Sequence, residues 1–115
     1  MAEILLKETG DTTLNVGDTT KFLNVKQGRK EHHVWEYTIA GIVTDVTVRV
    51  EGSNTEANGS EKAFNLNPND VDTVKTANGT FGISIPSVPV EKIRFNFVGA
   101  TGGTPTIVVN YAGGG

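Results

Sequence analysis

The chain has 115 residues, which is enough for one domain with a buried core and too few for two. Its 13 acidic and 10 basic side chains do not gather into blocks, so we expect neither a nucleic-acid-binding surface nor attraction to acidic membranes. Cysteine is absent from the sequence, which excludes disulfides, a thiolate nucleophile and a cysteine-ligated zinc site. Met1–Lys7 lacks the basic start and long apolar run of a signal peptide, so we expect synthesis in a host cytoplasm.

The first third of the chain is predicted to form three short strands. They are Glu3–Glu8, Thr12–Val16 and Thr19–Val25. Gly17-Asp18, between the second and the third, is a two-residue hairpin signal because glycine supplies the backbone conformation that such turns need. A polar loop, Lys26–His33, leads to the next strand.

Val34–Gly52 has the clearest pattern of the chain. Apolar side chains alternate with polar ones on both sides of Ala40-Gly41, which predicts two long, half-buried antiparallel strands. The apolar positions are Trp35, Tyr37 and Ile39 in the first strand and Val46, Val48 and Val50 in the second. Trp35 is the single tryptophan, and we expect it to anchor the core.

The second half of the chain begins with an exposed loop, Gly52–Glu61, and continues as strands. The predicted strands are Lys62–Leu66, Val71–Thr76, Thr80–Ile85, Lys92–Val98 and Thr106–Tyr111. Asn78-Gly79 is the strongest hairpin signal, and one helical turn is predicted near Pro68–Val71. The whole pattern predicts a single all-β domain over residues 1–115, an antiparallel β-sandwich of jelly-roll or immunoglobulin-like type with about eight to nine strands.

Few residues are candidates for chemistry. His32 and His33 are neighbours on a strand, so they point to opposite faces and cannot easily chelate one ion; we interpret them as a solvated loop end. Asn67–Asp72 offers oxygen ligands but lacks the twelve-residue calcium loop with its closing glutamate, which favours a surface turn. Trp35 and Tyr37 could stack on a sugar, but their alternation with Ile39 favours the core. We therefore assign no catalytic, cofactor-binding or metal-binding residues and expect no enzyme activity, cofactor or small-molecule substrate.

Two passages resemble the small β-sandwich structural proteins of tailed bacteriophages. The first is Val46–Ser53, a strand that ends in a Glu-Gly-Ser turn. The second begins with the strand Lys92–Val98 and runs through a turn rich in glycine and threonine to the strand that ends at Tyr111. The resemblance implies a virion component, either a capsid decoration (cement) protein or a tail or baseplate module. It brings no catalytic residues with it.

From this resemblance we expect a non-enzymatic decoration protein that binds and stabilises a phage head. Its partner would be the major capsid protein or another virion protein. It would lie on the capsid surface and would form a homotrimer. The alternative is a carbohydrate- or receptor-binding module of a tail or baseplate. Such a module would need exposed aromatic side chains on its loops, and the loops Lys26–His33 and Gly52–Glu61 contain none.

The two ends of the chain are the predicted contact with a partner. Residues 1–8 are expected to form an arm, because a sheet with one wet face cannot hide three successive large apolar side chains. Residues 112–115 are expected to be a flexible or partner-held tail, since glycine has no side chain to pack and depends on backbone pairing. The predicted interface residues are Ile4, Leu5, Leu6, Gly113, Gly114 and Gly115.

Overall fold

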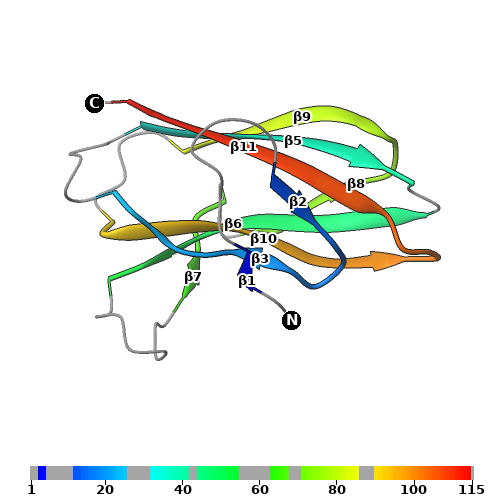
Figure 1. The fold of residues 1–115 in the computed structure, drawn as a ribbon, viewed down its shortest axis with the longest axis horizontal. Helices are drawn as coiled ribbons and strands as arrows, with labels where there is room; N and C mark the ends of the chain where they lie inside the picture. The colour runs from blue at the N-terminus through cyan, green and yellow to red at the C-terminus, as the bar shows by residue number, and fades with distance from the viewer. Residues whose placement is uncertain are drawn as a thin grey trace.

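The computed structural model describes residues 3–4, 12–25, 32–41, 44–54, 63–67, 71–85 and 90–114 (Figure 1). These residues form strands and no helix, in two sheets that stack as a β-sandwich. The all-β sandwich prediction is confirmed, and the pairing is antiparallel except between β1 and β3. In the part of the chain that is described, no helix is long and apolar enough to cross a membrane.

Seven strands form one sheet, with β10 and β6 paired side by side at its centre. They are β1 (Glu3–Ile4), β3 (Thr19–Thr20), β4 (Leu23–Asn24), β6 (Asp45–Ser53), β7 (Phe64–Asn65), β8 (Thr73–Lys75) and β10 (Lys92–Thr101). β3 and β4 share the outer edge of β10, and β7 and β8 share the outer edge of β6.

The second sheet has four strands in the order β2-β11-β5-β9. They are β2 (Thr12–Leu14), β11 (Thr106–Gly114), β5 (His32–Ala40) and β9 (Gly79–Ile85). The described residues form eleven strands, more than the expected eight or nine. One reason is that Thr19–Val25, predicted as one strand, divides into β3 and β4.

Four glycines with positive φ lie at points where the chain passes from one sheet to the other, between β2 and β3, β5 and β6, β8 and β9, and β10 and β11. They are Gly17, Gly41, Gly79 and Gly102, with φ values of 88°, 79°, 146° and 85°. The hairpins predicted at Gly17-Asp18 and Asn78-Gly79 are therefore wrong, because the strands on either side lie in different sheets. Likewise β5 and β6 are long and half-buried as predicted, but they do not pair with each other.

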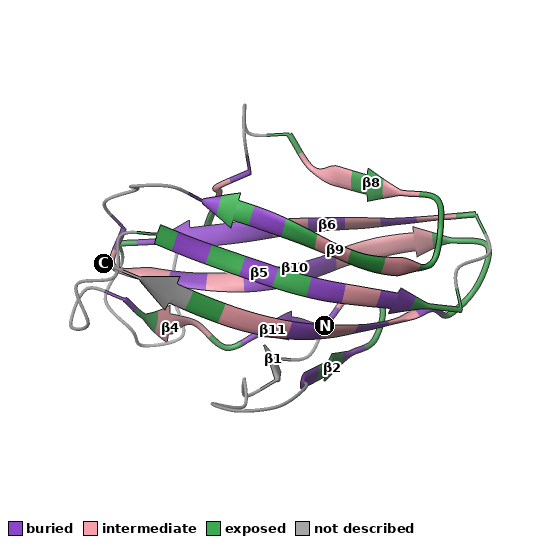
Figure 2. Ribbon diagram, turned by 90° about the horizontal axis from the view of Figure 1, so that it is seen from above, coloured by how far each residue is buried: buried purple, intermediate pink, exposed green. Residues whose placement is uncertain are grey.

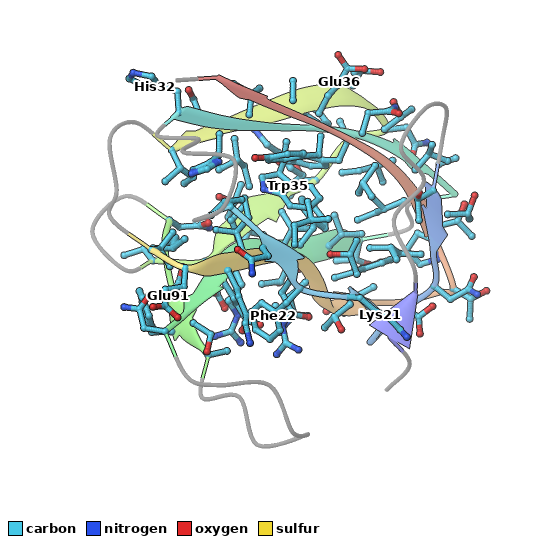
Figure 3. The ribbon with its side chains drawn as sticks, turned by 60° about the vertical axis from the view of Figure 1, so that its left-hand side comes forward. Lys21, Phe22, His32, Trp35, Glu36 and Glu91 are labelled. Atoms are coloured by element: carbon cyan, nitrogen blue, oxygen red, sulfur yellow. The ribbon has the colours of Figure 1, made fainter. Side chains whose placement is uncertain are left out.

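The core fills the space between the sheets, and Figure 3 shows Trp35 within it. Trp35, Val48 and Phe95 are fully buried, as predicted from their alternation. Phe81 is only half-buried and packs its ring 5.8 Å from that of Tyr37. Of the helical turn predicted near Pro68–Val71, residues 68–70 lie outside the described part of the chain. The buried apolar residues are Leu14, Val25, Trp35, Tyr37, Ile39, Val46, Val48, Val50, Ile83, Ile85, Val90, Ile93, Phe95, Phe97, Ile107 and Val109.

The side chain of Asn67 supplies hydrogen bonds to the backbone of β6 on the edge where the pairing passes from β8 to β7. β8 pairs with Val46–Val48 and β7 with Glu51–Gly52, so the backbone between these segments needs other partners. The Asn67 Oδ1 accepts the Val50 N–H at 2.9 Å, and its Nδ2 donates to the Val48 carbonyl at 3.4 Å. A buried side-chain amide thus takes the place of a strand.

Replacing Asn67 by alanine should therefore lower the free energy of unfolding by about 2–3 kcal/mol, because two buried backbone groups lose their partner. Urea unfolding followed by tryptophan fluorescence measures the change. Asn15→Ala, at an exposed position, is the matched control and should change stability by less than about 0.5 kcal/mol. Equal effects of the two substitutions would show that Asn67 does not support β6.

Both tyrosines of the chain have a raised pKa, so the stability of the fold should depend on pH in the alkaline range. Burial raises the pKa of Tyr37 to about 12 and also raises that of Tyr111. The unfolded chain ionises near the usual value of 10.0, so stability should be complete below that pH and fall as the pH rises toward about 12. Tyrosinate absorbance should show no titration at the usual value while the protein stays folded. A tyrosine that ionises at its ordinary pKa in the native state would contradict the burial that raises its pKa.

Candidate functional site

The predicted terminal interface is only partly within the described residues. Ile4 lies in β1, which pairs with β3 of its own chain through the registers of Glu3 with Thr19 and of Ile4 with Thr20. Gly113 and Gly114 belong to β11 and pair with His33 and His32. Backbone pairing does order the glycines, but within the chain, so their order requires no neighbour. Leu5, Leu6 and Gly115 lie outside the described residues.

The outer face of the seven-stranded sheet carries a cluster of paired charges. Glu51 accepts a hydrogen bond from Arg94 Nε at 2.7 Å and one from Asn96 Nδ2 at 3.2 Å. Arg49 lies between Glu51 and Asp72, with its Nε 3.5 Å and 3.4 Å from their carboxylate oxygens. The β6–β10 register sets this geometry, because it places Arg94 opposite Glu51 and Asn96 opposite Arg49.

Phe22 closes one side of this cluster. Its ring lies 4.5 Å from the guanidinium carbon of Arg94, and Figure 3 shows it on the outer side of the seven-stranded sheet. The ring lies over the face of the planar guanidinium, while the Nε of Arg94 donates a hydrogen bond to Glu51. The side chain of Glu51 is only 8% exposed. Because its acidic and basic groups neutralise one another, this cluster is a stabilising network and not an open charged site.

The outer face of the four-stranded sheet has a different character. Its central positions form three rows across β9, β5 and β11, and we call these positions the flat face. The rows are Ser84–Val34–Ala112, Gly82–Glu36–Asn110 and Thr80–Thr38–Val108. Exposed and buried residues alternate along β5 in Figure 2, and Figure 3 shows Glu36 on the side away from the core.

The side chains of the flat face are small, and a single charge interrupts them. Val34 is 42% exposed, and the hydroxyls of Thr38 and Thr80 share a hydrogen bond of 2.9 Å that ties β5 to β9. Glu36 is the one charged residue of the nine positions, and no ion pair or hydrogen bond joins its side chain to another described residue. Charged residues are depleted at the centre of protein interfaces, and the flat face has one among its nine positions.

The two histidines occupy opposite faces of β5, as predicted from their adjacency. His32 is exposed, whereas His33 is 1% exposed, so the interpretation of both as a solvated loop end is wrong for His33. Its Nδ1 is hydrogen-bonded to the Tyr111 hydroxyl at 2.8 Å, and the two rings stack with centroids 6.0 Å apart. His33 is buried because β5 begins at His32, earlier than the apolar pattern indicated, which places His33 in the inward-facing row.

His33→Ala should consequently lower the free energy of unfolding by about 1–3 kcal/mol, because it empties a buried position and leaves the Tyr111 hydroxyl without this bond. His32→Ala is the natural control, one residue away and exposed, and should cost less than about 0.5 kcal/mol. Thermal unfolding of the two variants provides the comparison. The assignment fails if the two substitutions are equally mild.

Asn67–Asp72 is also more than the surface turn that the sequence favoured. Asn67 is buried and uses its side-chain oxygen on the Val50 amide, so this atom is occupied by the fold. Asp72 accepts a hydrogen bond from Asn65 Nδ2 at 2.8 Å. Residues 68–70 lie outside the description. Among the described residues, no group of three or more His, Asp or Glu side chains is arranged to hold a metal ion.

Sequence reasoning placed Glu36 and Thr38 on the polar side of β5 but did not identify the flat face. The face is assembled from three strands that are distant in the sequence, and their order in the sheet was not predicted. One signal was present: Thr80, Gly82 and Ser84 alternate with Phe81 and Ile83, so the outward row of β9 could have been recognised as small and uncharged.

Comparisons with known proteins identify no family for this chain. No family model matches the sequence, and no curated protein matches it. Among solved structures, the SPBc2 prophage-derived protein YomS is similar at 12% identity and a TM-score of 0.45, over 96% of this chain and 100% of that one. PliG of Aeromonas hydrophila, a periplasmic inhibitor of g-type lysozyme, is similar at 12% identity and a TM-score of 0.32, over 96% and 97% of the two chains. At these levels neither similarity assigns a function.

Proposed function

We propose that this chain is a non-enzymatic structural protein of a tailed-phage virion, and specifically a decoration protein that binds the outside of the capsid. The observation that carries the proposal is the contrast between the two outer faces of the sandwich. The charges of Arg49, Glu51, Asp72 and Arg94 on the seven-stranded sheet are paired with one another, whereas the flat face presents small side chains and one carboxylate without a described partner. The flat face is the surface we assign to contact with the shell.

The resemblance of Val46–Ser53 and of the segment from Lys92 to Tyr111 to phage β-sandwich proteins supports the same class of function. A protein of this class acts by binding and not by reaction. If it binds only the folded shell, it stabilises the shell by mass action, and the stabilisation grows with the logarithm of its concentration relative to the dissociation constant.

The size of the flat face argues for several copies acting together. Three strands about 4.8 Å apart and three rows about 6.8 Å apart cover roughly 300 Å². A stable interface buries about 800 Å² on each partner, so one flat face alone would hold weakly. A trimer that presents three such faces at once gains affinity through effective concentration. We therefore include a homotrimer in the proposal, with Ile4–Leu6 and Gly113–Gly115 as the candidate contacts between copies.

The test is the composition of purified virions of the phage or prophage that encodes the chain. Quantitative mass spectrometry should find it in a fixed ratio to the major capsid protein and in the head fraction after heads and tails are separated. Heads of a gene-deleted phage should release their DNA at a lower temperature. The decoration role is overturned if the protein is missing from virions, or if it occurs in a few copies that fractionate with tails. The second result would favour the carbohydrate- or receptor-binding alternative.

A further inference from the structure

Gly82 occupies a position where the fold itself does not need glycine. It lies at the middle of β9, an edge strand of the four-stranded sheet, and its φ is not positive. A Cβ added there would meet only the Trp35 carbonyl oxygen, at 3.9 Å, which is ordinary contact. Glycine inside a strand weakens it, and one recognised reason for its presence is the close approach of another molecule's backbone or side chain.

The missing side chain leaves a notch beside the single charge of the flat face. Gly82 is directly opposite Glu36, and Asn110 flanks Glu36 on the other side. Thr80 and Ser84 stand before and after the notch along β9. Glu36 is exposed, and its neighbour on β9 has no side chain. A partner's side chain could therefore approach Glu36 over β9.

From this geometry we infer that the partner on the flat face inserts a lysine or arginine over Gly82 and pairs it with Glu36. The occupant is a protein segment with small side chains around one basic residue, since the flat face has small side chains around one acidic residue. A second copy of this chain fits less well, because a two-fold contact through this face would bring two Glu36 carboxylates together. The inference rests on the proposed function and identifies the chemistry of the contact.

The test uses heads purified from the gene-deleted phage, to which the full-length protein and its variants are added. Gly82→Thr fills the notch with a β-branched side chain, and Glu36→Lys reverses the charge. Gly99→Thr is the matched control, because Gly99 lies opposite Thr47 on the other sheet and a Cβ there meets nothing within 4 Å. Co-sedimentation gives the bound fraction, and thermal unfolding gives the stability of each free protein.

Gly82→Thr should weaken binding at least about tenfold while it raises the unfolding midpoint of the free protein by about 2–6 °C. Glu36→Lys should weaken binding at least as much and remove most of its dependence on salt concentration. Gly99→Thr should bind like the wild type. Wild-type binding that survives both Gly82→Thr and Glu36→Lys overturns this inference and leaves the proposed function intact. Failure of the wild-type protein to bind the heads overturns the decoration role, and this inference with it.

Discussion

Trp35→Ala is expected to lower the free energy of unfolding by about 3–5 kcal/mol, a large part of the stability of a domain of this size. The side chain is fully buried, and its ring lies 4.9 Å from that of Tyr111 and 5.7 Å from that of Phe95. Truncation removes contacts to both sheets at once, because Tyr111 belongs to β11 and Phe95 to β10. Denaturant unfolding monitored by far-ultraviolet circular dichroism measures the loss.

Two further substitutions separate packing from other causes. Val34→Ala, one residue away and exposed, should cost less than about 1 kcal/mol. Trp35→Phe should cost less than Trp35→Ala, because it keeps an aromatic ring and discards an indole N–H that has no hydrogen-bond partner among the described residues. If Trp35→Ala and Val34→Ala cost the same, Trp35 does not anchor the core.

Glu51→Gln is expected to cost about 2–3 kcal/mol, the second large effect. The substitution removes the negative charge that faces Arg94 and Arg49. It also replaces one of the two carboxylate oxygens by an NH2 group, so Arg94 and Asn96 can no longer each donate to an oxygen of their own. Loss of one partner from a buried ion pair costs about 3–5 kcal/mol, and the partial exposure of Arg94, at 17%, reduces that figure. A double-mutant cycle with Arg94→Met should give a favourable coupling energy between the two side chains.

The Arg49–Asp72 pair provides the contrast. Its side chains are 30% and 33% exposed, so solvent screens the pair and Asp72→Asn should cost about 1 kcal/mol or less. Raising the salt concentration should diminish the Arg49–Asp72 contribution more than that of Glu51 and Arg94. A Glu51→Gln protein as stable as the wild type would show that the cluster does not contribute to the stability of the fold.

The alternation of apolar residues was enough to predict the strands and the side of each that faces the core. It worked for Trp35, Val48 and Phe95 because period two in sequence becomes two faces in space whichever strand lies alongside. It could not predict which strands pair. The inward-facing apolar pattern is the same for strands that pair within a sheet and for strands that face each other across the core. A glycine with positive φ can likewise occur in a hairpin or in a connection between sheets. The Asn78-Gly79 signal was therefore assigned to a hairpin and proved to be a passage between sheets.

The polar contacts depended on that pairing and were not predictable before it was known. Glu51 meets Arg94 only because β6 and β10 are neighbours in a particular register. His33 can form its hydrogen bond to Tyr111 only because β11 pairs with β5. The flat face combines β9, β5 and β11, so its composition emerges only with the strand order. Short-range sequence patterns predict well which residues are buried. They predict poorly which polar residues from distant parts of the sequence come into contact.

The most direct test of the central claim, that the flat face is the docking surface of a virion protein, is a cryo-electron microscopy map of the decorated particle. We expect β9, β5 and β11 to turn their outer face toward the shell, with density of a basic side chain over Gly82 beside Glu36. The Arg49–Glu51–Arg94 cluster should face away from that contact. A map in which the flat face is open to solvent, while the opposite sheet or only the chain termini touch the shell, would contradict this claim.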